Sequence, residues 1–284
     1  LVISAILGPV SAGAKIRSPK LPRLEVIDRQ PAEHTGRNPI LFVHGLGHGA
    51  WCWENWMELA AEAGYPAYAV SLRGHGGSEG SLKKSHLGSY VNDVIRTAST
   101  LPKQAIIVGH SLGGLVVQRT IAKYAAKAAV LVAPVGARPG VRVMAKIAGQ
   151  HPGDALKISL GGSLNLRYEY LFEALEQGEA DRYLARCTGE SPWAQFQVLL
   201  HKPSDSPRGR APVMVMSTPD DNLIPAGDTL FTARRYSAEQ LEFPGIGHDL
   251  MLDRDWQVPG RALIGWLDQN VPADGQPAAA GSSA

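Results

Sequence analysis

Gly109-His110-Ser111-Leu112-Gly113 is the stretch that decides the fold of this 284-residue chain. It follows the apolar run of residues 105–108, which has the composition of a buried strand, and precedes the helix-forming run of residues 115–119. A serine between two glycines at such a strand-to-helix turn is strained, and its hydroxyl is exposed above the sheet. The pattern therefore predicts that Ser111 is a nucleophile. Without these flanking elements, the same five residues would indicate only a Gly/Ser turn.

An early loop supplies the second part of the expected site. Residues 40–43 are β-prone and end at His44-Gly45-Leu46-Gly47. Backbone N–H groups that point at the oxygen of a tetrahedral intermediate lower the barrier by ~3–4 kcal/mol each. We expect these donors to be Leu112, which follows the nucleophile, and Leu46, with Gly45 shaping the turn beside the substrate.

Two late segments supply a carboxylate and a base. The strand-like run of residues 212–217 is followed by a loop that holds Asp220 and Asp221. Catalytic groups collect at the carboxyl ends of parallel strands, and we expect Asp221 rather than its competing neighbour Asp220 to orient the base. The expected base is His248, in a glycine-flanked loop between a strand-like segment and the last helix. The chain order Ser111, Asp221, His248 is the Ser-Asp-His order of one class of hydrolases.

These motifs resemble those of the α/β-hydrolase superfamily over roughly residues 38–270. The resemblance is carried by the elbow at 109–114, the oxyanion loop at 42–45, the histidine loop at 247–249 and a Gly-rich segment at 73–78 that is similar to monoglyceride-lipase-like members. Segments 48–53 and 248–252 are similar to plant methylesterases and hydroxynitrile lyases. The lyases use a lysine shortly after the histidine, where this chain has Asp249 and Leu250, which argues against cyanohydrin cleavage.

Strand and helix patterns alternate along most of the chain. This alternation predicts an α/β fold with a mostly parallel central sheet flanked by helices. It breaks between residues 135 and 212, where helical segments at 141–147, 171–175, 181–186 and 193–201 resemble the helical cap of α/β-hydrolases. We expect the following division: a flexible arm or leader remnant at 1–24, the core at 25–134 and 211–271, the cap at 135–210, and a disordered tail at 272–284.

Apolar residues near the expected site suggest what the substrate contacts. We expect substrate-binding roles for Gly45, Trp51, Trp53, Trp193, Leu250 and Met251. Within the cap, the candidates for an acyl pocket are Leu166, Phe172, Trp193, Phe196 and Leu199. For any one of these side chains the alternative is that it only joins the cap to the core.

Composition excludes several classes of protein. The 28 basic and 26 acidic residues give a formal charge of +2, which favours neither a nucleic-acid surface nor an acidic partner. Two cysteines, Cys52 and Cys187, are too few for a disulfide scaffold. His44 and His48 lack an accompanying cluster of ligands, so we expect no metal and no cofactor.

The apolar stretch 1–10 is too short to span a membrane, so we expect a cytoplasmic protein, or a secreted one if that stretch is a leader remnant.

The sequence thus predicts a carboxylic ester hydrolase (EC 3.1.1 type) for small to medium, largely apolar ester substrates. Its mechanism would use a Ser-His-Asp triad and an acyl-enzyme. Three alternatives stay open on the same scaffold: an acyltransferase or perhydrolase, a hydrolase of carbon–carbon bonds, and a ligand-binding receptor. The sequence leaves the oligomeric state and the acyl chain length open.

Overall fold

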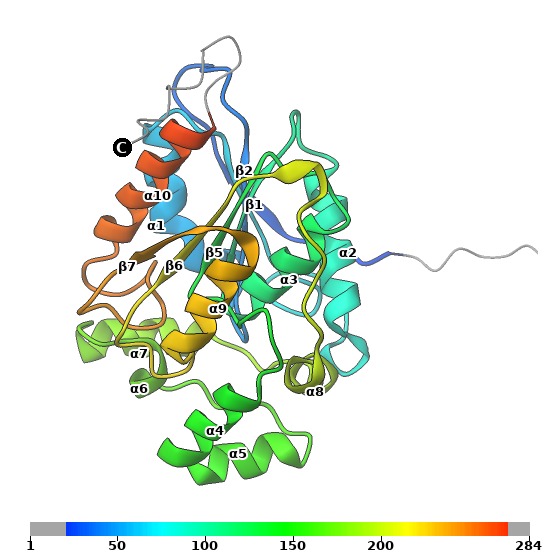
Figure 1. Cartoon of the computed structure of the whole chain (residues 1–284), viewed down its shortest axis with the longest axis vertical. Helices are drawn as coiled ribbons and strands as arrows, with labels where there is room; N and C mark the ends of the chain where they lie inside the picture. Colours follow the sequence, from blue (N-terminus) through cyan, green and yellow to red (C-terminus); the bar gives the residue numbers. More distant parts are fainter. Residues whose placement is uncertain (1–20, 272–284) are drawn as a thin grey trace, which may run out of the picture.

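A seven-stranded sheet in the order β1-β3-β2-β4-β5-β6-β7 forms the centre of the computed structural model (Figure 1). The structure describes residues 21–271, so the expected tail and most of the expected N-terminal arm lie outside the described residues. Every neighbouring pair is parallel except β1 (Val26–Arg29), which runs antiparallel to β3 (Ala67–Val70). The prediction of a mostly parallel sheet is confirmed.

The central strands are apolar except at the carboxyl ends of β4 and β6, because helices cover both faces of the sheet. Every residue of the four central strands is buried. These strands are β2 (Ile40–Val43), β4 (Ile106–His110), β5 (Ala128–Val132) and β6 (Val213–Ser217). The two edge strands, β1 and β7 (Glu239–Glu242), are mostly exposed or half-buried. This explains why β1 has no apolar run and was not among the expected strands.

Helices cover the sheet as the alternation predicts. In Figure 1, α1 (Glu54–Glu62) and α10 (Gln257–Asn270) lie together on one side of the sheet, with α2 (Leu87–Ala98) and α3 (Leu112–Ile121) on the other. Helix α9 (Ala226–Tyr236) packs on β6. Three short 3-10 helices complete the core segments: η1 (Ala50–Trp53), η2 (Leu82–Lys84) and η3 (Arg208–Arg210). None of the helices within residues 21–271 combines the length and the apolar character needed to cross a membrane.

Five helices between β5 and β6 gather at one end of the sheet and form the expected helical cap (Figure 1). They are α4 (Val141–Gln150), α5 (Pro152–Ser159), α6 (Tyr168–Leu171), α7 (Gln177–Arg186) and α8 (Pro192–Leu200). Helix α8 begins as its sequence predicts, with Ser191 accepting a hydrogen bond from Ala194 N and a proline in the first turn. The residue boundaries of the cap stay a prediction.

The helix expected at 171–175 is wrong, since α6 ends at Leu171. The backbone N–H groups of Glu173 and Ala174 donate to the carboxylate of Asp253, at 2.9 and 3.2 Å, instead of to a helical carbonyl. Helix α5 was not expected, because its first two residues are Pro152 and Gly153. Proline fits the first turn of a helix, where its missing N–H has no intrahelical partner to lose.

Candidate active site

The turn between β4 and α3 holds Ser111 in a strained conformation. Its φ is 51° and its ψ is −117°, values that L-residues rarely adopt. The turn also requires two glycines: a Cβ at Gly113 would lie 2.3 Å from His44 O, and one at Gly109 would lie 2.5 Å from Gly113 O. Ser111 N donates to Val132 O at 2.9 Å, which fixes the turn against β5. Local geometry therefore explains the Gly-x-Ser-x-Gly pattern.

The loops after β6 and β7 bring a carboxylate and an imidazole together. His248 Nδ1 lies 2.7 Å from Asp221 Oδ2, and both side chains are buried. Asp221 Oδ1 accepts from the backbone N–H groups of residues 223 and 224 at 2.8 and 2.7 Å, so the carboxylate is held from two sides. The neighbouring Asp220 instead accepts from Gly245 N at 2.6 Å. Of the two competing aspartates, Asp221 is the one that contacts the imidazole.

The charge of Asp221 determines how His248 titrates. Burial alone would lower the pKa of His248, but the charge of Asp221 and the hydrogen bond that His248 donates to it outweigh burial and raise the pKa above 6.5. A general base works best when its pKa lies near the working pH. The pair is therefore suited to take a proton from a hydroxyl and to return it later.

One cavity of about 80 Å³ brings the predicted catalytic residues together. Its lining includes Ser111, His248 and the two expected oxyanion residues, Leu46 and Leu112. Leu112 is the first residue of α3, so its N–H has no acceptor within the helix and lies at the positive end of the helix dipole. An anion that develops beside Ser111 would meet this N–H group.

The remaining wall of the cavity is almost entirely apolar. Core residues on it are Val135, Leu223 and Ile224; cap residues are Val143, Met144, Ile147, Ile158, Leu164, Leu166, Leu171, Val198 and Leu199. Two of the five expected acyl-pocket residues, Leu166 and Leu199, are thus on this wall. The side chains from α4 were not predicted. Their only signal in the sequence is the amphipathic pattern of that helix.

None of the six expected substrate-binding residues is among the described residues that line the cavity. Trp53, Leu250 and Met251 are fully buried in the core, whereas Trp193 is 60% exposed on α8. Trp51 stacks on His48, with 5.4 Å between the ring centroids. The sixth, Gly45, lies behind the nucleophile, where an added Cβ would be 3.0 Å from Ser111 Cβ. Apolar residues of the core and of a cavity have the same composition, so sequence could not separate them.

A buried carboxylate next to the expected base links the loops around the cavity. Asp249 Oδ2 lies 2.9 Å from His48 Nε2, and His48 Nδ1 donates to Leu46 O at 2.9 Å. Asp249 Oδ1 lies 3.4 Å from His110 Nε2, which is an ion-pair distance without good hydrogen-bond geometry. His110 Nε2 in turn lies 3.1 Å from His248 O. Asp249 thereby connects the oxyanion loop, the elbow and the histidine loop, a connection that the sequence did not predict.

The charges within this cluster follow from burial and proximity. Burial alone would lower the pKa of His48, but Asp249 outweighs it and raises the pKa well above 6.5. Burial alone would raise the pKa of Asp249, but His48 outweighs it and keeps the pKa below 3.8. Burial, together with the neighbouring His248, lowers the pKa of His110 to about 3. The cluster is therefore an imidazolium–carboxylate pair beside a neutral imidazole.

Ligand atoms of His110, His248 and Asp249 lie within 4.8 Å of one another, a spacing that suits metal ligands. His248 is already engaged by Asp221, and Asp249 by His48. A metal ion would compete with both of these pairs, so we assign the cluster to protein contacts. The absence of a metal stays a prediction.

Cys52 lacks the surroundings of a nucleophile. Among residues 21–271, Cys52 and Cys187 are free thiols. Burial raises the pKa of Cys52 well above 9.0, which disfavours its thiolate. Cys187 Sγ lies 3.9 Å from His48 Nε2, at the edge of the polar cluster.

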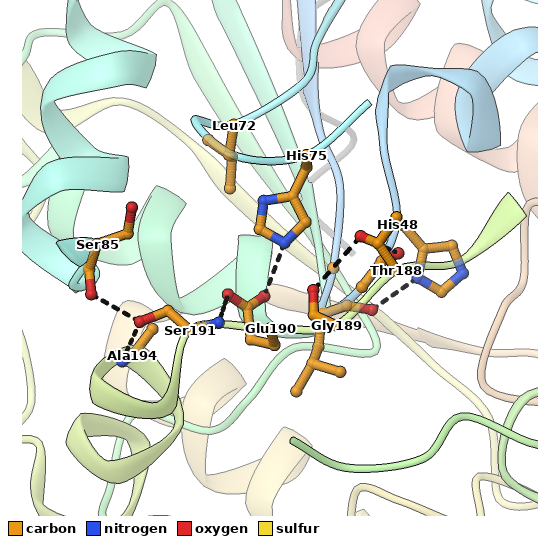
Figure 2. A network of polar contacts seen from close by, with 12 residues as sticks. His48, Leu72, His75, Ser85, Thr188, Gly189, Glu190, Ser191 and Ala194 are labelled. Atoms are coloured by element: carbon orange, nitrogen blue, oxygen red, sulfur yellow. Dashed lines mark hydrogen bonds and ion pairs between the residues drawn. The ribbon is translucent and has the colours of Figure 1, made fainter. Parts of the chain in front are cut away.

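A second polar network ties the cap to the core (Figure 2). Glu190 is buried between His75, whose Nε2 lies 3.3 Å from Glu190 Oε2, and the backbone N–H of Ser191, which donates to Glu190 Oε1 at 2.6 Å. Tyr90 donates to the same oxygen at 2.5 Å. Ser191 Oγ donates to Ser85 O at 2.6 Å. The segment that leads into α8 is therefore fixed to the core by buried polar contacts.

Sequence comparisons find plant esterases among the proteins similar to this chain. The chain is 28% identical over 215 residues to a pFDCC methylesterase from Arabidopsis thaliana, covering 66% of this chain and 80% of that protein. It is 31% identical over 125 residues to a probable esterase from Oryza sativa subsp. indica, covering 43% of this chain; it thus spans only 45% of that relative's length.

Solved structures show the same fold. An esterase from Exiguobacterium antarcticum superposes with a TM-score of 0.67 at 14% identity, covering 87% of this chain and 96% of that one. A Paleococcus ferrophilus monoacylglycerol lipase gives a TM-score of 0.66 at 22% identity, with 86% and 98% covered. The sequence profile of the alpha/beta hydrolase family matches residues 40–258, which is most of the chain. This protein belongs to the alpha/beta hydrolase family.

Proposed function

We propose that this protein is a carboxylic ester hydrolase that acts through Ser111, His248 and Asp221. The observation that carries the proposal is that Ser111, on a strained turn, lines the same apolar cavity as His248, whose Nδ1 is 2.7 Å from Asp221. The methylesterase and esterase relatives support this class of reaction.

In the proposed mechanism, His248 takes the proton of Ser111 as the serine oxygen attacks the ester carbonyl. The N–H groups of Leu46 and Leu112 stabilise the oxyanion of the tetrahedral intermediate. His248 then gives its proton to the leaving alcohol, and an acyl-enzyme remains. A water molecule, deprotonated by the same imidazole, attacks the acyl carbon; the acid leaves and the serine hydroxyl is restored. Asp221 stays ionised and stabilises the imidazolium in each half-reaction.

The cavity favours an uncharged substrate with a short acyl group. Its lining is mostly apolar, and His48, a charged residue on it, is already paired with Asp249, so burying a charged acyl group there would cost desolvation free energy. Its volume of about 80 Å³ is well below the roughly 300–1,000 Å³ of pockets that enclose drug-sized ligands. We therefore propose acyl chains of a few carbons, with the alcohol group toward the opening.

A panel of p-nitrophenyl esters from acetate to palmitate tests the proposal. Ser111→Ala should lower turnover by about four orders of magnitude or more, whereas Ser99→Ala, an exposed serine at the end of α2, should leave it unchanged. Wild-type activity should be highest for the shortest chains. Undiminished turnover in Ser111→Ala would refute the serine mechanism, and a maximum at palmitate would refute the proposed acyl size.

A further inference from the structure

A second hollow lies on the side of the molecule, separated from the active-site cavity by α8. It has a volume of about 520 Å³, and its walls come from α2, from the end of α3, from α8 and from the loop after α8. Among the described residues the two hollows share no lining residue. Val198 and Leu199 of α8 line the active-site cavity, whereas Phe196 and Leu200 line the second hollow. The two hollows therefore lie against different faces of one helix.

The second hollow carries more positive than negative charge. Arg119, Lys123 and Lys202 line it, together with one carboxylate, Asp205. Within residues 21–271, no carboxylate forms an ion pair with any of the three cations. Lys123, Lys202 and Asp205 are exposed, and water solvates them. Arg119 is only partly exposed, so its charge has lost part of its hydration.

The guanidinium of Arg119 is the least satisfied of these groups. Its Nε is buried and has no hydrogen-bond partner among the described residues. His201 is buried in the same wall, and its Nε2 likewise has no hydrogen-bond partner among the described residues. Burial lowers the pKa of Arg119. A partly buried cation without a partner costs free energy, and an anion that accepts from the terminal nitrogens of this guanidinium offsets part of that cost.

Apolar side chains stand beside this charge. Phe196 is 52% exposed and Leu200 is 64% exposed, although both are large hydrophobic residues. A ligand that covers them and also accepts from Arg119 needs an anionic head and an aliphatic or aromatic part. The planar guanidinium fits carboxylate and phosphate oxygens in particular.

We propose that this hollow is a binding site for a small amphiphilic anion, separate from the ester-hydrolysing site. The carboxylate or phosphate head pairs with Arg119, the two lysines add long-range attraction, and the apolar part lies over Phe196 and Leu200. The site does not depend on the proposed esterase activity, because it shares no side chain with that cavity.

Calorimetric titration of the full chain with octyl phosphate, below its micelle concentration, tests the proposal. One equivalent should bind, and Arg119→Gln should weaken binding by about tenfold or more, as loss of a charge-assisted hydrogen bond does. The matched control is Arg261→Gln, an exposed arginine on α10 that removes the same net charge. It should change the affinity less than twofold. Lys123→Gln/Lys202→Gln, at exposed positions, should weaken binding severalfold.

The chemistry of the ligand is resolved by further probes. Octanoate should bind if the site accepts any anionic head, and its failure alongside octyl phosphate binding would restrict the site to phosphate esters. Inorganic phosphate should bind more weakly than octyl phosphate because it leaves Phe196 and Leu200 uncovered. The affinity for octanol, which has no charge, should be the same in wild type and Arg119→Gln. Equal affinity of wild type and Arg119→Gln for octyl phosphate would overturn the proposal, as would equal weakening by Arg261→Gln. If Arg119→Gln does not fold, an unchanged affinity in the lysine double variant overturns it.

Discussion

Asp249→Asn is the substitution that most directly tests how the catalytic loops are held together. Asp249 is fully buried, and its Oδ2 lies 2.9 Å from His48 Nε2. Burial lowers the pKa of His48, and Asp249 outweighs this effect. An asparagine keeps the shape of the side chain but removes the charge. Burial is then opposed only by the contribution of Cys187, so the pKa of His48 should fall.

The magnitude follows from the linkage between proton binding and folding. A histidine with a higher pKa in the folded than in the unfolded chain stabilises the fold fully below about pH 6.5, and this stabilisation is lost as pH rises through the folded-state pKa. Each such group contributes about −1.4 kcal/mol per pH unit to the slope of the unfolding free energy. His48 and His248 both have raised pKa values. Between about pH 6.5 and the folded-state pKa values of the two histidines, both contribute to a negative slope, and Asp249→Asn should make that slope shallower by up to about 1.4 kcal/mol per pH unit.

Urea denaturation at several values from about pH 7 to about pH 8.5 measures these slopes. Asp255→Asn, an exposed aspartate, is the control and should keep the wild-type slope. The variant should also lose activity, because His48 donates to Leu46 O and so holds the loop that carries the proposed oxyanion N–H of Leu46. We expect kcat to fall by about tenfold, less than the 10²–10³-fold loss of a whole oxyanion donor. Identical slopes for wild type and Asp249→Asn would refute the reasoning that this carboxylate sets the charge of His48.

Three further substitutions separate the parts of the site. Asp221→Asn should lower kcat by about 10⁴-fold and move the acid limb of kcat/KM to lower pH, because the carboxylate that raises the pKa of the catalytic imidazole is gone. Asp220→Asn should leave kcat and the acid limb unchanged. Equal losses of kcat in the two variants would contradict the assignment of Asp221 as the partner of His248. Gly45→Ala would place a Cβ 2.7 Å from His110 Nδ1, so kcat/KM should fall about tenfold or more. Full activity in this variant would show that the loop moves aside at little cost. Ile147→Ala enlarges the cap wall of the cavity and should raise the rate ratio of hexanoate to butyrate esters severalfold, whereas Leu160→Ala, 79% exposed, should not. An unchanged ratio in Ile147→Ala would mean that the acyl chain does not lie in this cavity.

The sequence predicted the parts of the molecule whose cause is local. The strand, tight turn and helix around Ser111 follow from an apolar run, two glycines that permit close backbone contact, and a helix-forming run. The central strands and the core helices likewise follow from apolar runs and from periodicity. The proximity of Asp221 and His248 was an inference from topology, because both follow parallel strands that end at the same edge of the sheet.

Contacts between distant segments carry no such local signal. His48 and Asp249 are 201 residues apart in the sequence, and only the completed sheet brings them to 2.9 Å. The sequence does contain one indication of this contact. Asp249 is a carboxylate immediately before the apolar run of residues 250–252, and a buried charge requires a partner. Much of the cap side of the cavity lining was missed for a related reason. Trp53 and Ile147 are equally apolar, but the first packs inside the core and the second faces the cavity from the cap.

The cap is therefore more than a wall over the substrate, because it also contacts the loops that carry the proposed chemistry. Thr188 N donates to Gly47 O at 2.7 Å, next to the oxyanion residue Leu46. Lys146 Nζ of α4 donates to the backbone carbonyl of Asp221. Both contacts hold the backbone of a catalytic loop and leave its functional group free. A movement of the cap that admits a larger substrate would release these two carbonyls together. We therefore expect acyl size and catalytic rate to be coupled through α4 and the segment at 188–191, although the side chains that line the cavity are distinct from those that hold the loops.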